Sequence, residues 1–103
     1  MNIQTTLAER KTTHGEFVAN AYITMVMKNL LRRGTSYNQL SADQQLALDM
    51  IAHKMGRAVN GDPDYIDNWT DIIGYATLVE DRMKETAAKK EEVALNENPD
   101  AVS

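Results

Sequence analysis

The chain has 103 residues, 43% of them hydrophobic and 25% charged, which suits one compact domain and is too little for two independent cores. Fifteen acidic residues against eleven basic ones give a formal charge of −4, so no uniformly cationic surface is available for a nucleic-acid backbone, and the lack of cysteine excludes disulfides and thiolate chemistry. No apolar stretch is long enough for a membrane span or a signal-peptide core, so we expect a soluble, cytoplasmic protein.

Apolar residues recur at helical rather than alternating spacing, which predicts an all-α fold. The first helix is expected to begin near residues 14–16 and to run to Arg33. Its apolar stripe comprises Ala19, Ile23, Val26 and Leu30. Because this helix is apolar around more than half of its circumference, one neighbouring hairpin cannot cover it. We therefore expect a homo-oligomer in which a second subunit buries the rest.

The second helix is expected to run from Ser41 to about Val59, because Ser41 followed by Gln44 is a good helix start. Its core stripe comprises Leu48, Ile51, Met55 and Val59. The run over residues 60–64, Asn-Gly-Asp-Pro-Asp, then predicts a reversal of the chain, since glycine accepts positive φ and proline ends a helix.

The third helix is expected to begin within residues 64–67. It carries apolar side chains inward at Trp69, Ile72, Ile73, Ala76, Val79 and Met83. From Lys84 onward large apolar residues become scarce, so the helix should project past the core to about Glu92 and then fray. These elements predict a three-helix bundle with an antiparallel hairpin of its second and third helices. The bundle would be a single domain over residues 1–83, and 84–103 would form a projecting charged helix end and a disordered tail.

In an antiparallel hairpin, residues of the two helices lie opposite each other when the sums of their residue numbers are nearly equal. Arg57 should then face Asp67, and Lys54 should face Asp71. One interpretation is a solvated clamp between the two helices. The other is a polar pocket in which the two basic residues grip an anion, with the acids orienting it and with Tyr75, one turn beyond Asp71, as a further hydrogen-bonding group.

A second polar cluster precedes the first predicted helix and contains Arg10, Lys11, His14 and Gly15. Amides at a helix N-terminus favour anions, and a glycine lets a ligand approach the backbone, so this cluster is a candidate phosphate site. The structural alternative is a solvated arm with a capping histidine. Phe17 is expected in the core rather than as a base-stacking platform, and His53 as an exposed helix residue rather than a ligand.

Three segments together resemble a family of small tailed-phage and prophage proteins of unknown function. They are Arg10 to Phe17 (RKTTHGEF), Leu48 to Arg57 (LDMIAHKMGR), and Gly61-Asp62-Pro63 followed by Asp67 to Ala76 (DNWTDIIGYA). The resemblance covers roughly residues 9–83. It implies a phage or prophage source and an all-α fold, and it implies no established activity.

A weaker similarity is to the MazG-like all-α nucleoside triphosphate pyrophosphatases, oligomers that hold Mg²⁺ with acidic side chains on adjacent helices. The Glu-x-x-Glu pair and the later Glu-x-x-Asp of that family are absent here. The helix facing Asp67 and Asp71 offers Lys54 and Arg57 in place of acids, which would partly neutralise a metal site.

The first functional hypothesis is a phage-encoded binding or accessory protein of the host cytoplasm, without a cofactor, that binds a nucleotide, another phosphate-bearing anion or a host protein. Its candidate ligand-binding residues are Arg10, Lys11, His14, Gly15, Lys54, Arg57, Asp67, Asp71 and Tyr75. The alternative is an Mg²⁺-dependent pyrophosphohydrolase with the metal on Asp67, Asp71 and Glu16. Binding of nucleic acid through Arg10, Lys11, Arg32 and Arg33 is disfavoured, because even residues 1–83 have no basic excess.

Overall fold

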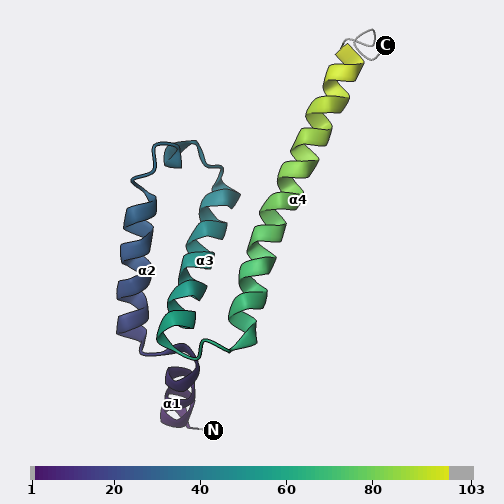
Figure 1. Ribbon diagram of the computed structural model, residues 1–103. Helices are drawn as coiled ribbons and strands as arrows, with labels where there is room; N and C mark the ends of the chain where they lie inside the picture. The colour runs from purple at the N-terminus through teal and green to yellow at the C-terminus, as the bar shows by residue number, and fades with distance from the viewer. Residues whose placement is uncertain (1, 98–103) are drawn as a thin grey trace.

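The computed structural model describes residues 2–97, and within them the chain forms helices and connecting turns without a β-strand (Figure 1). The elements are α1 (Ile3–His14), α2 (Phe17–Leu31), the short 3-10 turn η1 (Tyr37–Gln39), α3 (Ala42–Asn60) and α4 (Ile66–Glu97). The all-α prediction is therefore confirmed. None of the helices in this described part combines the length and the apolar character needed to cross a membrane.

The three long helices lie side by side with α3 in the middle, and each runs antiparallel to its neighbour (Figure 1). α2 and α4 each pack against α3 but do not pack extensively against each other. The short α1 lies at the end of the layer where α2 begins and α3 ends, and it contacts both. The predicted hairpin of α3 and α4 is thus present. The predicted three-helix bundle is not confirmed, since α2, α3 and α4 form an open layer.

Local signals placed α3 and its turn correctly. The Ser41 amide donates to Gln44 Oε1 at 3.0 Å, half of the predicted capping box. Arg82 of α4 reinforces this end of α3, because its guanidinium binds both carboxylate oxygens of Asp43, at 2.8 and 3.0 Å, and the Ser41 hydroxyl at 2.8 Å. At the other end α3 stops at Asn60 and the chain reverses over residues 61–65, as the turn sequence predicted.

The sequence patterns did not predict α1. This helix has no buried residue, so the apolar stripe that reveals other helices is missing. Its support is local: the Asn2 side chain accepts from the Thr5 amide at 2.8 Å, and Gly15 ends the helix with φ 84°. The first predicted helix, expected to reach Arg33, is in fact α2, and it ends at Leu31.

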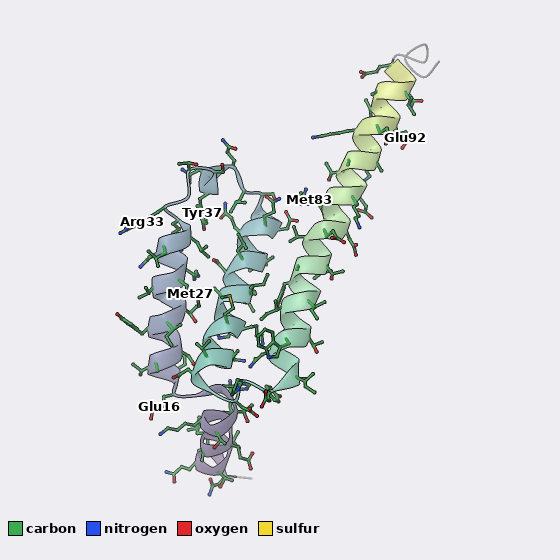
Figure 2. All side chains as sticks on the ribbon, in the orientation of Figure 1. Glu16, Met27, Arg33, Tyr37, Met83 and Glu92 are labelled. Carbon is green, nitrogen blue, oxygen red and sulfur yellow. The ribbon has the colours of Figure 1, made fainter. Side chains whose placement is uncertain are left out.

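α4 is five residues longer than expected, since it continues to Glu97 rather than fraying after Glu92. Its last turns project well past the beginning of α3, and Glu92 lies on this projecting part (Figure 2). The ion pair of Lys84 Nζ with Glu80 Oε1, at 3.0 Å, supports the helix just before this projecting part. The disordered tail that we expected falls partly on residues 98–103, which lie outside the described residues.

The interior of this single chain is very small. The buried apolar side chains are only alanines among the described residues, namely Ala47, Ala52 and Ala58. Residues that the sequence predicted to point inward are instead exposed, including Trp69 at 53% and Ile73 at 66%. The same holds for the predicted core position Val59, which is 74% exposed. The reason is geometric: a layer one helix thick has two open faces, so only side chains wedged between adjacent helices are covered.

Candidate functional site

A pocket of about 540 Å³ opens where α1, α2 and α3 meet. Its polar lining residues come from all three helices and are Arg10, His14, Asn20, Thr24, His53 and Arg57. Leu7, Phe17, Ala21 and Met25 supply its apolar wall. None of these lining residues is acidic, so the pocket, which we call the cationic pocket, has two guanidinium groups and two imidazoles without a facing carboxylate.

Close backbone packing between the α1–α2 junction and the end of α3 builds this pocket. The Asp62 amide donates to the Thr13 carbonyl at 2.8 Å. A Cβ atom on Gly61 would collide with the backbone of Thr13 and His14, and one on Gly15 would collide with Asn60. Glycine is therefore required at both positions for the segments to approach. Gly15 thus serves as a packing residue that brings α1 against α3.

A chain of amide hydrogen bonds fixes the floor of the same junction. Asn20 Nδ2 donates to the His14 carbonyl at 2.6 Å, and Asn60 Nδ2 donates to Asn20 Oδ1 at 3.0 Å. Asn20 is only 7% exposed, so its amide is a structural group that joins α1, α2 and α3. His14 is further held by an edge-on contact with the ring of Tyr65, whose centroid lies 5.4 Å away.

Both pocket histidines favour the neutral form. Burial is the largest cause that lowers the pKa of His14, and the positive charges of Arg57 and Arg10 lower it further. Burial likewise lowers the pKa of His53, followed by the charges of Arg57 and Lys54. An anion in the cationic pocket would reverse the electrostatic part of these shifts. The two imidazoles can therefore take up protons when a negative ligand binds.

Two buried polar atoms of the pocket residues have no hydrogen-bond partner. They are His14 Nδ1 and Thr24 Oγ1. Thr24 is 8% exposed, and burying a hydroxyl without a partner costs about 1–3 kcal/mol. Thr24 Oγ1 faces Gly56 between α2 and α3, so these atoms lie behind the pocket surface and not on it.

The structure divides the residues that we predicted as one site. Arg10, His14 and Arg57 line the cationic pocket. Lys54 Nζ instead lies 2.9 Å from Asp71 Oδ2, the pair expected from the antiparallel register. The second expected pair, Arg57 with Asp67, is absent from the described ion pairs. Arg57 lines the pocket instead. Asp67 lies beside Tyr65, and a hydrogen bond with Asp67 is the largest cause that raises the pKa of Tyr65.

The remaining predicted residues lie apart from the pocket lining. Lys11 Nζ pairs with Glu16 Oε1 at 2.9 Å on the surface. Tyr75 lies on α4, one turn beyond Asp71. In the part of the chain that the structure describes, no three His, Asp or Glu side chains form a group that could hold a metal ion. Glu16 therefore does not join Asp67 and Asp71 in the acidic cluster that the enzyme alternative needs.

Sequence reasoning missed two polar lining residues and misplaced two others that it had named. Asn20 and Thr24 interrupt the apolar pattern of α2 with a spacing of four, a signal that could have marked a polar face. His53 is half-buried in the pocket rather than a simple exposed residue. Phe17 is 83% exposed at the pocket wall, not in the core as expected.

Comparison with known proteins places the chain in a family without assigning an activity. A family model described as "Domain of unknown function (DUF6378)" matches residues 3–83, which include α1, α2, α3 and the first half of α4. No curated protein matches the chain. No solved structure matches it either. Because the match covers far more than half of the sequence, the chain belongs to the DUF6378 family of domains of unknown function.

Proposed function

We propose that the protein binds a phosphate-bearing anion, such as a nucleotide, in the cationic pocket. The observation that carries this proposal is the combination of two guanidinium groups and two imidazoles around one cavity, with no lining carboxylate. Arginine guanidinium groups bind phosphate oxygens in bidentate geometry, and Arg10 and Arg57 come from different helices toward the same cavity. Lys11 and Lys54 already have carboxylate partners and serve at most as outer charges.

The size and the mixed lining of the pocket support a ligand larger than inorganic phosphate. A volume of about 540 Å³ is within the range of small-molecule sites. The apolar wall includes Phe17 and Met25, which are 83% and 49% exposed before a ligand covers them. A nucleoside base is flat and apolar on its faces. Stacking of the base on Phe17 would bury apolar surface of the ligand, which the charged groups of the pocket cannot do.

The proposal retains the biological setting that the sequence resemblance implies. The segments that suggested a resemblance to tailed-phage and prophage proteins include the pocket residues Arg10, His14 and Arg57. We therefore propose a phage-encoded accessory protein that acts in the host cytoplasm through this ligand. Binding of a host protein would be a consequence of the ligand-bound state or a separate property of the same chain.

Isothermal titration calorimetry with inorganic phosphate, nucleoside mono-, di- and triphosphates, each with and without Mg²⁺, tests this function. Wild-type protein should bind at least one nucleotide, and Arg57→Gln should lose about ten- to hundredfold in affinity, because a charge-assisted hydrogen bond contributes about 1.5–3 kcal/mol. Arg32→Gln is the matched control, since Arg32 ends α2 at the opposite end of the layer. Equal losses in both variants, or no binding by wild type, would contradict the proposal.

The hydrolase alternative predicts a different result from the same reagents. It requires Mg²⁺-dependent pyrophosphate release that disappears in Asp71→Asn while the helical circular dichroism spectrum is unchanged. Binding without turnover supports the binding protein. Turnover that depends on Asp71 would instead support the hydrolase, even though the described residues offer no three-acid metal cluster.

A further inference from the structure

We propose that a second copy of this chain covers one open face of the α2–α3–α4 layer, so that the functional unit is a dimer of two helical layers. Three grooves that share Ile51 form this apolar face. Two of them, of about 690 Å³ each, lie between α3 and α4, and the third, of about 310 Å³, lies between α2 and α3. The face therefore spans the whole layer.

The side chains of the apolar face come from every long helix. α3 contributes Leu48, Ile51 and Met55 along its middle, α2 contributes Met27, and α4 contributes Ile72 and Val79. Figure 2 shows Met27 between α2 and α3, and Met83 on α4 beside the beginning of α3. Several of these side chains keep much of their area in solvent, among them Met55 at 45%. Apolar faces of this extent are uncommon on stable monomers.

The dimensions of the chain agree with a missing second layer. Its accessible surface is 7944 Å², whereas a compact monomer of this mass exposes about 5,800 Å². The chain measures 67 × 31 × 21 Å along its principal axes, so it is flat and elongated rather than spherical. The excess surface exceeds the about 800 Å² per partner that a standard interface buries. One chain thus exposes enough area to form a standard dimer interface.

Charge and symmetry favour a second copy as the occupant. Despite the overall charge of −4, the charged residues that border the α3–α4 groove are Glu80 and Lys84, which pair with each other at 3.0 Å. Two such faces can meet without repulsion between like charges. Helical domains require two packed layers, and a two-fold axis lets the same apolar face supply both. A highly charged partner would find no complementary charge on this face.

The dimer would leave the cationic pocket open. His53 and Arg57 on α3 face the pocket, and with about 100° per residue they lie on the side opposite Leu48, Ile51 and Met55. The second copy and the anion therefore bind to opposite faces of one layer. Dimerisation would stabilise the layer that positions the pocket without supplying a residue to it.

Sedimentation equilibrium of the full chain tests the proposal, with two variants. Wild-type protein should have twice the chain mass or a larger even multiple at micromolar concentration. Met55→Lys places a charge on the apolar face at a side chain exposed enough to tolerate it in a monomer, and should raise the dissociation constant at least tenfold. Leu78→Lys is the control, because Leu78 is 68% exposed and points from α4 away from the apolar face.

A second measurement keeps the test independent of the folding of Met55→Lys. Because the chain has no cysteine, Met55→Cys and Leu78→Cys can each carry one spin label. The label at position 55 should report a shorter distance between copies than the label at position 78. A monomeric wild type overturns the proposal, as does a dimer whose labels are closer at 78 than at 55 or that only Leu78→Lys disrupts.

Discussion

α2 packs tightly against α3 at Gly56, and replacing this glycine provides a quantitative test of the layer. A Cβ atom at position 56 would lie 2.9 Å from Thr24 Oγ1 and 3.6 Å from the Asn20 carbonyl oxygen. Gly74 on α4 is the matched position, since a Cβ there would have no neighbour within 4 Å. Both glycines lie inside helices, so the intrinsic gain from alanine is the same at the two sites.

The expected free energies follow from two opposing effects. Alanine in place of a helical glycine stabilises by about 1 kcal/mol, so Gly74→Ala should raise the free energy of unfolding by about that amount. At position 56 the added methyl group also overfills a tight contact, which costs about 1–3 kcal/mol, because Thr24 is β-branched and buried and cannot rotate away cheaply. Gly56→Ala should therefore lie between neutral and about 2 kcal/mol destabilised.

Urea denaturation followed by circular dichroism, at one fixed protein concentration, measures both variants under the same association equilibrium. Gly56→Ala combined with Thr24→Ala provides the internal control, because the second change removes the oxygen that the new methyl group meets. In the Thr24→Ala background, Gly56→Ala should stabilise as Gly74→Ala does. If Gly56→Ala alone stabilises as much as Gly74→Ala, then α2 and α3 do not approach closely at Thr24 and the pocket geometry is incorrect.

Three other predictions concern charges. A double-mutant cycle of Lys54→Met and Asp71→Asn should give a coupling of about 1 kcal/mol in the free energy of unfolding, and a coupling near zero would reject the α3–α4 register. Hydrogen bonds, first from Arg82 and then from Ser41, lower the pKa of Asp43 from 3.8 to about 2. The stability that this carboxylate contributes is therefore present above pH 3.8 and is lost as the pH falls through about 2. The difference in melting temperature between wild type and Arg82→Met should accordingly shrink over that range. An unchanged difference at the acid end would show that the ion pair of Arg82 with Asp43 does not contribute to stability. Sulfate keeps a constant charge near neutrality, and by calorimetry it should bind about three- to tenfold more tightly at pH 6 than at pH 8. The reason is that a bound anion raises the lowered pKa values of the two pocket histidines. An affinity that does not change with pH would show that the histidines do not contact the anion.

The sequence alone determined the elements whose causes are local. Ser41 and Gln44 are three residues apart, and the turn over residues 60–64 needs only its own glycine and proline, so both were found where the structure has them. The pairing of Lys54 with Asp71 also followed from numbering, because an antiparallel hairpin with a short turn leaves little freedom of register. α1 escaped detection since it depends on end caps and side-chain hydrogen bonds to its own backbone, without an apolar stripe.

Only the tertiary structure decided which charges share a site and which apolar residues are covered. Residues 10, 14 and 57 meet because Gly15 and Gly61 let two distant backbone segments touch, a contact that no periodicity reveals. Thr24 became a pocket residue because α2 and α3 approach closely at Gly56. Helical spacing predicts that Trp69 and Ile73 belong to an apolar face, yet whether that face is buried depends on how many layers assemble, and a single chain supplies one.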